Sequence, residues 1–300
     1  MTSQSTPLPA LARPAEATRP RLYRGMRVLE VLRVEQVSAR MRRIVLGGPE
    51  MNGIGTGPNI KLLIPPEGVS QPQWPLEGPD GRALWPPPEL RPVPRTYSVR
   101  RLDPARGELS VDFALHGHEG PAARFVRRAR PGDLIGLAGP GGRALPEAET
   151  VLLAGDLSGL PSIAAILERL PRITRGHAFL EVADAGDEQD LTAPPGVRIT
   201  YLHRGSAEAG TTRLLEDAVC AAGLPAQGLA AWVAAESSAA RALRAHLRDE
   251  RGLGARALVA VGYWKRGMSE GAYHDAHDHD RDADYHRAAR QEQEEQGAPS

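Results

Sequence analysis

Residues 91–103 read Arg-Pro-Val-Pro-Arg-Thr-Tyr-Ser-Val-Arg-Arg-Leu-Asp, and the decisive part is the tetrapeptide Arg95-Thr96-Tyr97-Ser98. The run predicts a β-strand, in which neighbouring side chains point to opposite faces. Arg95 and Tyr97 then share one face, and Thr96 and Ser98 share the other. A cation and an aromatic ring on one face suit a ligand that has a flat aromatic part and a phosphate part. An ordinary barrel strand with a surface arginine is the alternative interpretation.

Short apolar runs separated by glycine and proline surround this stretch and predict a small antiparallel β-barrel. Six such runs lie between Met26 and Gly142, at residues 27–34, 41–46, 60–64, 96–100, 109–115 and 133–137. A proline-rich insertion over 65–94 interrupts them, and insertions of this length are either functional or disordered. One helix is predicted over 122–129, because Pro121 precedes it and a Pro-Gly pair follows it.

After residue 149 strands alternate with helices, which predicts an α/β doubly wound parallel sheet after the antiparallel β-barrel. We expect four segments, namely a disordered leader over 1–20, the barrel domain over 21–147, the α/β domain over 148–268 and a polar tail over 269–300. The tail interleaves histidines with aspartates. We expect it to be solvated and partly helical, although such runs also bind metals.

Composition limits the class of protein. At 300 residues, with 41% hydrophobic and 25% charged residues and a formal net charge of zero, the chain is typical of a soluble globular protein, and its charge does not favour nucleic acid. No apolar window of about 18 residues and no signal peptide are visible, so we expect no membrane insertion and a cytoplasmic location. Cys220 is the only cysteine, which excludes an internal disulfide and a four-cysteine iron–sulfur cluster; its apolar surroundings predict a core position.

No hydrolase, zinc-protease or P-loop motif occurs, and the histidine spacing in the tail matches no closed zinc site. A glycine-rich turn does precede the predicted helix, in the run His116-Gly117-His118-Glu119-Gly120-Pro121-Ala122-Ala123. Backbone N–H groups and the positive dipole end at a helix N-terminus suit a pyrophosphate, and a glycine lets the backbone approach closely. A capped helix with a flexible preceding loop explains the turn equally well.

Two further motifs lie in the α/β region. The turn Gly155-Asp-Leu-Ser-Gly-Leu-Pro161 follows the first strand, where a nucleotide domain has its phosphate turn, although Asp156 brings a negative charge there. A plain strand–helix turn capped by Asp156 or Ser158 is the alternative. The run Val261-Gly-Tyr-Trp-Lys-Arg-Gly267 puts two aromatic and two cationic residues at the carboxyl end of the last strand, where such sheets hold ligands. A strand end packed over the core, with its cations in solvent, is the alternative.

The order of these motifs over residues 24–275 resembles the siderophore-interacting protein family, which are ferric-siderophore reductases among the ferredoxin-reductase-like flavoproteins. The shared pattern is Arg-x-Tyr-Ser, then His-Gly-x-x-Gly-Pro-Ala, Gly-Asp-x-x-x-x-Pro, Trp232…Glu236 and Gly-Tyr-Trp-Lys-x-Gly. The resemblance implies an FAD-binding barrel followed by a nicotinamide-type domain. It also implies reduction of Fe(III)-siderophores to release Fe(II), with FAD as cofactor and NADH or NADPH as electron donor.

The resemblance further implies which residues contact the cofactor. They are Arg95, Thr96, Tyr97, Ser98, His116, Gly117, Gly120, Pro121, Ala122, Ala123, Asp156, Ser158 and Pro161. No catalytic acid or base is expected, because the protein positions and tunes a cofactor that carries the chemistry. Ferric siderophores are often anionic, so we expect cations near the flavin to dock them, and the candidates are Lys61, Arg128, Lys265 and Arg266.

Three alternatives stay open. Leu157-Ser158-Gly159 stand where family members usually have Glu-Thr-Ala, so a reduced ferredoxin is an alternative electron donor. A general flavin-dependent NAD(P)H reductase that serves a partner protein is the second alternative. The third is a non-catalytic iron-chelate or metal-binding protein that uses the histidine-rich tail, and it predicts colourless protein.

Overall fold

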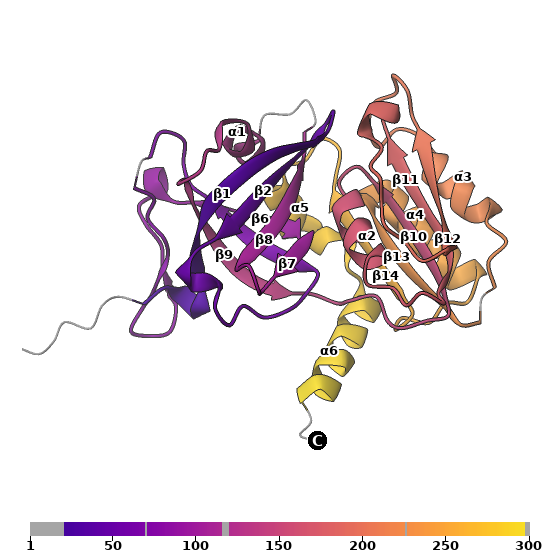
Figure 1. Ribbon diagram of the computed structural model, residues 1–300. Coiled ribbons are helices and arrows are strands. Elements are labelled where there is room, and N and C mark those ends of the chain that lie inside the picture. Colours follow the sequence, from indigo (N-terminus) through magenta and orange to yellow (C-terminus); the bar gives the residue numbers. More distant parts are fainter. Residues whose placement is uncertain (1–20, 70, 116–119, 226, 298–300) are drawn as a thin grey trace, which may run out of the picture.

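The computed structural model describes residues 21–69, 71–115, 120–225 and 227–297, which form two main β-sheets (Figure 1). The N-terminal sheet is antiparallel, with seven strands in the order β6-β3-β9-β1-β2-β8-β7. Its strands are β1 (Arg27–Ser38), β2 (Met41–Gly47), β3 (Asn59–Ile64), β6 (Val93–Ser98), β7 (Arg101–Asp103), β8 (Glu108–Ala114) and β9 (Leu134–Gly141). The connection from β3 to β6 carries a small hairpin, formed by β4 (Leu76–Glu77) and β5 (Ala83–Leu84).

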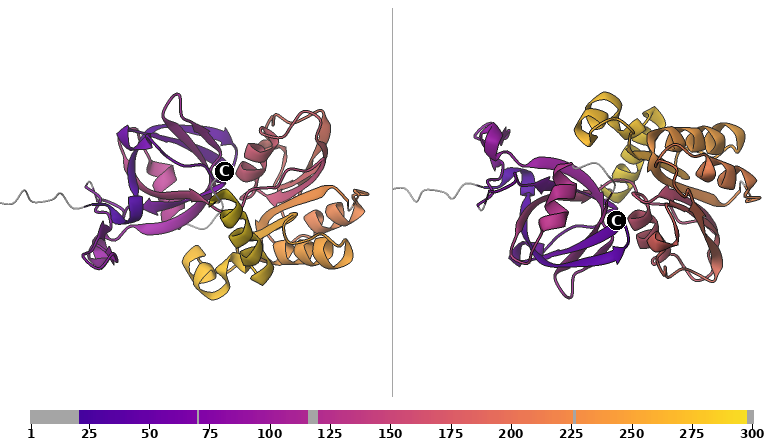
Figure 2. Two further views of the ribbon diagram at one scale, coloured as in Figure 1. Left: turned by 90° about the horizontal axis from the view of Figure 1, so that it is seen from below. Right: turned by 90° about the horizontal axis from the view of Figure 1, so that it is seen from above.

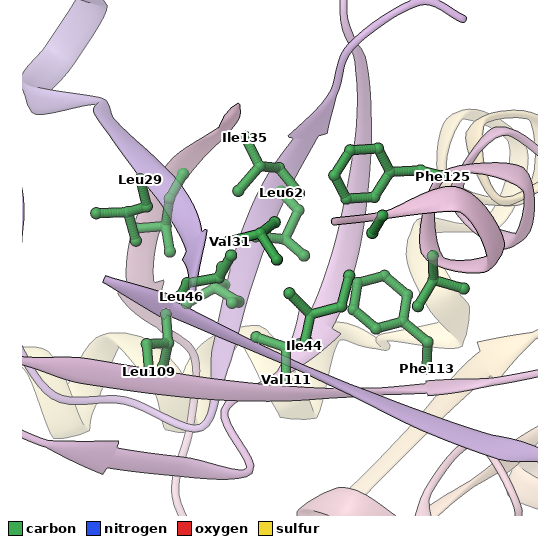
Figure 3. Packing of buried hydrophobic residues seen from close by; sticks show 14 of the residues in the cluster. Leu29, Val31, Ile44, Leu46, Leu62, Leu109, Val111, Phe113, Phe125 and Ile135 are labelled. Carbon is green, nitrogen blue, oxygen red and sulfur yellow. The ribbon is translucent and has the colours of Figure 1, made fainter. Parts of the chain in front are cut away.

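The antiparallel sheet curls into a barrel around an apolar core. Its edge strand β6 reaches β8 near the opposite edge, so that the ring centroids of Tyr97 and Phe113 lie 4.3 Å apart. Alternate side chains fill the interior, and Leu29 and Val31 of β1 have no exposed surface there (Figure 3). The predicted antiparallel barrel is confirmed.

Helix α1 (Pro121–Arg128) packs on this core. Pro121 stands in its first turn, as the sequence predicts, and the preceding Gly120 is extended. Phe125 of α1 lies among the buried side chains of the barrel (Figure 3). Val126, the next residue, is buried in the same cluster. Helix α1 is therefore part of the barrel core.

The second sheet is parallel and has the strand order β12-β11-β10-β13-β14 (Figure 1). Its strands are β10 (Thr150–Asp156), β11 (Arg175–Val182), β12 (Gly196–His203), β13 (Leu229–Glu236) and β14 (Leu258–Trp264). Its helices are α2 (Leu160–Leu167), α3 (Leu214–Ala221) and α4 (Ser237–Ala245), and α4 continues into a π-helical turn over His246–Glu250. The order reverses between β10 and β13, and the carboxyl ends of strands at such a switch point are where these folds bind ligands. The predicted doubly wound sheet is confirmed.

Two apolar clusters cover the two faces of the parallel sheet, as its burial requires. Helices α3 and α4 pack on one face through residues such as Leu215 and Leu243. Helix α2 packs on the other through Ile163, and this second cluster includes the fully buried Met41 of barrel strand β2. The second cluster thus joins the two domains, and Figure 2 shows α2 on the side of the sheet that faces the barrel.

Cys220 is exposed, so the predicted core position is wrong. Helix α3 and the residue after it bury Leu215, Val219 and Ala222, which recur at helical spacing. Cys220 follows Val219 directly and therefore points away from that buried stripe.

The chain after residue 268 folds as helix α5 (Glu270–His277), a 3-10 turn over Asp278–Asp280 and helix α6 (Ala283–Gly297). Helix α5 contacts strand β6, and α6 projects away from the sheets (Figure 1). Among the described residues, neither α6 nor any other helix is long and apolar enough to cross a membrane.

Helix α5 and the turn after it are docked on strand β14. Tyr273 is fully buried, and its hydroxyl donates to the Asp280 carboxylate at 2.6 Å. Gly262 of β14 permits this approach, because a Cβ there would lie 1.9 Å from the Tyr273 hydroxyl oxygen. His279 is also buried and lies 3.2 Å from the Gly262 carbonyl oxygen. The expectation of a solvated tail is therefore wrong for Tyr273 and His279, whose rings pack on the sheet.

Candidate functional site

Strand β6 carries the Arg95–Ser98 stretch to the junction of the two domains. In the pairing with β3, Arg95 and Tyr97 lie opposite Leu62 and Ile60, which are both buried in the barrel core. Residues paired in this way share a face of the sheet. Arg95 and Tyr97 therefore share the inner face and the two hydroxyl residues share the outer one, as the sequence predicts. Burial raises the pKa of Tyr97, so its hydroxyl stays protonated.

Arg95 forms an ion pair with Glu270 at the start of α5. The Arg95 Nε lies 3.4 Å from Glu270 Oε2, and the side chains are only 17% and 18% exposed. The other carboxylate oxygen, Oε1, accepts a hydrogen bond from the Thr96 backbone N–H at 2.8 Å. That N–H is available because β6 is the edge strand of its sheet. Burial raises the pKa of Glu270, against the opposing effects of the Thr96 N–H and the Arg95 charge.

The Glu270 carboxylate shows that this place on β6 can receive an anion. A guanidinium and an unpaired strand N–H converge on its two oxygens. A phosphate group offers oxygens of the same charge and hydrogen-bonding character. The donors on β6 therefore fit the phosphate part of a flavin nucleotide, and a phosphate bound there would compete with Glu270.

Ser98, on the outer face of β6, connects the barrel to the parallel sheet. It is 6% exposed, and its hydroxyl lies 3.2 Å from the hydroxyl of Tyr263 on β14. Tyr263 also interacts with the Ser162 hydroxyl in the first turn of α2. Burial raises the pKa of Tyr263, and the two serine contacts oppose that rise.

The turn after β10 is built around the Asp156 carboxylate. Oδ1 accepts hydrogen bonds from the Ser158 backbone N–H at 2.9 Å and from the Ser158 hydroxyl at 2.5 Å. Oδ2 accepts from the Glu236 backbone N–H at 2.9 Å and from Trp264 Nε1 at 2.7 Å. Asp156 thus ties together the carboxyl ends of β10, β13 and β14, and its negative charge is satisfied inside the protein. Asp156 and Ser158 are brought together as predicted, but they bond to each other.

Gly159 allows this turn to lie tightly against β13. A Cβ on Gly159 would lie 2.0 Å from the Ala234 carbonyl oxygen, which excludes any larger residue without a shift of the backbone. The buried Leu157 fills the core beneath the turn. The departure from the usual Glu-Thr-Ala is therefore a packing feature of this chain. Pro161 lies in the first turn of α2 and is itself buried.

Two of the four candidate docking cations lie near helix α5, and the other two form ion pairs elsewhere. Lys61 on β3 lies near enough to Glu270 to affect its pKa, and the Lys265 Nζ lies 3.1 Å from His277 Nε2 of α5. These two cations therefore flank α5. Arg128 and Arg266 each pair with a carboxylate elsewhere, at 2.9 Å from Glu67 and 3.6 Å from Glu208 respectively.

The glycine-rich turn is described only from Gly120 onward, and His116 and Gly117 lie outside the described residues. Ala122 is buried in the cluster against which Tyr97 packs, so the start of α1 and strand β6 border one core. Ala123 is half-buried on the same helix. Across the described ranges, no three histidine, cysteine, aspartate or glutamate side chains are grouped so that they could hold a metal ion.

Two residues of the junction, Tyr263 and Glu270, were missed by the sequence-based site prediction. Tyr263 belongs to the Gly-Tyr-Trp-Lys motif, which the sequence does show. The sequence does not show that Tyr263 contacts Ser98. Glu270 has no comparable signal, because it lies in a polar segment 174 positions after the Thr96 that it bonds.

A barrel with this strand, followed by a doubly wound parallel sheet, defines a two-domain fold class that includes the Amycolatopsis cytochrome P450 reductase GcoB, which gives a TM-score of 0.60 with 19% identity over 80% of this chain and 70% of that one. Within that class, the model of the siderophore-interacting FAD-binding domain matches residues 30–144, and that of the siderophore-interacting protein matches residues 148–267. The chain belongs to the siderophore-interacting protein family.

Individual relatives agree with this assignment. Ferric vibriobactin reductase ViuB of Vibrio cholerae is 35% identical over 254 residues, which are 83% of this chain and 93% of that protein. The siderophore-interacting protein SipS from Aeromonas hydrophila has a similar structure, with a TM-score of 0.74 and 36% identity over 84% of this chain and 97% of that one. A siderophore utilization protein from T. fusca also gives a TM-score of 0.74, with 38% identity over 81% of this chain and 94% of that one.

Proposed function

We propose that this chain is an FAD-dependent reductase that converts Fe(III)-siderophores to Fe(II), with NADH or NADPH as electron donor. The observation that carries the proposal is the anion position on β6, where Arg95 and the Thr96 N–H hold a carboxylate at the domain junction. The 35% identity to a ferric vibriobactin reductase supports the substrate class. When bound, FAD would supply the exchange between two-electron oxidation of the nucleotide and one-electron reduction of iron. The balanced reaction is NAD(P)H + 2 Fe(III) → NAD(P)⁺ + H⁺ + 2 Fe(II).

The residues of this chain bind and orient in this proposal, and none transfers a proton to iron. Arg95 and the Thr96 N–H would bind a phosphate oxygen, and Tyr97 and Ser98 would contact the flavin. The run His116, Gly117 and Gly120 to Ala123 would carry the pyrophosphate at the α1 N-terminus. Asp156, with Ser158 and Pro161, would shape the turn that faces the cofactor from the second domain.

Two finer points also belong to the proposal. Lys61 and Lys265, which flank α5, are favoured over Arg128 and Arg266 as docking cations for an anionic siderophore, because carboxylates already pair with both arginines. The reaction would take place in the cytoplasm. A reduced ferredoxin is kept as the alternative electron donor, because the packed Gly159 turn departs from the family pattern.

The first test measures flavin retention. Purified wild-type protein should show flavin absorption. R95A should fold but lose FAD on dilution, because it lacks the guanidinium that would bind a phosphate of the cofactor. R101A is the matched control, because Arg101 is an exposed arginine of the same barrel whose nearest carboxylate, Asp103, lies outside the site. If R95A retains FAD as fully as R101A, Arg95 does not bind the cofactor.

The second test identifies the donor and the acceptor. Anaerobic mixing with NADH, NADPH or a reduced ferredoxin shows which donor bleaches the flavin. Subsequent mixing with a ferric siderophore or with a soluble dye shows which acceptor restores its colour. Bleaching by neither nucleotide contradicts the proposed donor, and a preference for dyes over ferric chelates favours a general flavin reductase.

A further inference from the structure

A series of polar side-chain contacts runs from the core of the parallel sheet to strand β6 of the barrel. At its inner end, Trp232 Nε1 of β13 donates to the Ser162 hydroxyl at 3.2 Å. The Ser162 hydroxyl in turn donates to the Gly159 carbonyl oxygen at 2.7 Å. Trp232 and Ser162 are 2% and 3% exposed, so both are held firmly by the surrounding core.

The hydroxyl groups of Ser162 and Ser98 each have a defined acceptor. A serine hydroxyl has one proton, and that of Ser162 is committed to the Gly159 carbonyl. Ser162 also makes a side-chain contact with the Tyr263 hydroxyl. The Ser98 hydroxyl donates its one proton to the Tyr263 oxygen, 3.2 Å away.

We propose that Tyr263 is a positioning residue that holds the Ser98 hydroxyl proton away from the flavin, so that Ser98 presents hydrogen-bond-accepting lone pairs to it. The inference rests on the proposed function, because it assumes that FAD lies against β6. Burial raises the pKa of Tyr263 and keeps its hydroxyl protonated, so the hydrogen bond from Ser98 to Tyr263 is the same across the physiological pH range.

A hydrogen-bond acceptor at Ser98 interacts differently with the oxidised and the reduced flavin ring. Reduction with two electrons adds hydrogen to a ring nitrogen, which turns an acceptor of the oxidised flavin into an N–H donor of the reduced flavin. An accepting Ser98 therefore favours the reduced form. Without the Tyr263 hydroxyl, Ser98 is free to rotate and donate to the oxidised ring, so that preference is lost.

The expected size follows from the value of one neutral hydrogen bond, which changes an equilibrium constant about three- to tenfold. Y263F should lower the affinity for reduced relative to oxidised FAD by that factor. For a two-electron couple, in which a tenfold change is about 30 mV, the midpoint potential of bound FAD should fall by about 15 to 30 mV.

The experiment measures the midpoint potential of bound FAD in full-length wild type, Y263F, S98A and the double variant. Y201F is the matched control, because the Tyr201 hydroxyl bonds the Gln189 backbone at the other edge of the sheet. Its potential should equal that of wild type. If Tyr263 acts through Ser98, adding Y263F to S98A should cause no further fall. S98A also serves as a second route to the measurement, because it removes the same acceptor without altering β14.

Wild type that binds FAD, together with a Y263F potential that is unchanged or raised, overturns this inference and leaves the proposed function intact. A fall of equal size in the S98A background also overturns it, since Tyr263 then acts independently of Ser98. Wild type that binds no FAD contradicts the proposed function itself, and the inference with it.

Discussion

Replacing Glu270 by glutamine should tighten FAD binding. The Glu270 carboxylate occupies the place on β6 that a phosphate would take, with Arg95 Nε at 3.4 Å and the Thr96 N–H at 2.8 Å. An ion pair whose members are both less than a fifth exposed is worth about 1 kcal/mol, at the upper end for partly solvated pairs. FAD must displace that pair, so E270Q should bind FAD about fivefold more tightly. The amide keeps the shape of the side chain, so the helix start should be preserved.

The same competition gives a pH dependence of defined sign. Burial raises the pKa of Glu270, so the folded protein without FAD takes up this proton at a higher pH than an ordinary glutamate does. A protonated Glu270 no longer pairs with Arg95, and FAD affinity of the wild type should therefore increase as pH falls from neutral into the acidic range. In E270Q this increase should be absent.

Fluorescence titration of apoprotein with FAD measures both effects. E188Q is the matched control, because Glu188 is exposed and pairs with His203 at the far edge of the parallel sheet. Its FAD affinity and pH dependence should equal those of the wild type. An E270Q variant that binds FAD as weakly as wild type, or more weakly, would refute the competition and assign Glu270 a supporting role.

Two further predictions concern stability. R143A should lower the free energy of unfolding in urea by about 3 to 5 kcal/mol, because the buried Arg143 guanidinium donates to Glu292 and to three backbone carbonyls. R256A is the control. It removes the exposed ion pair with Glu295 and should change that free energy by less than about 0.5 kcal/mol. Burial lowers the pKa of His279 to about 4, so the unfolded chain binds a proton at this histidine more tightly than the folded protein does. The free energy of unfolding should therefore decrease as pH falls from about 6.5 to about 4, and the loss at pH 5 should be about 2 kcal/mol. Urea denaturation at pH 7 and pH 5 should show that loss reduced in H279Q, and an equal loss in both proteins would contradict it.

The parts of the fold that were predictable depend on local patterns. The alternation in β6 fixes which side chains of Arg95–Ser98 share a face, and Pro121 fixes where α1 begins. The change from short alternating runs to apolar strands with helices identifies the two sheets in their order. The predicted family is confirmed by matches that cover both domains. Local side-chain periodicity and helix punctuation were sufficient for these features.

The contacts of the site depend on tertiary docking, which no local pattern encodes. Glu270 reaches Thr96 only because the Tyr273 ring packs α5 against Gly262 of β14. The Asp156 carboxylate was predicted to face the cofactor. Its hydrogen bonds to the Glu236 backbone and the Trp264 ring become visible only when the ends of three strands are brought together in the folded protein. The docking of α5 was missed because its segment is polar in composition.

The central claim is tested most directly by counting electrons from donor to iron. The FAD-loaded wild-type protein is mixed anaerobically with a limiting amount of NADH or NADPH and an excess of ferric siderophore, and Fe(II) is trapped by a coloured chelator. The account predicts two Fe(II) for each nucleotide oxidised, and no Fe(II) when the nucleotide is omitted. A flavin that the nucleotide reduces but that ferric siderophore does not reoxidise would contradict it.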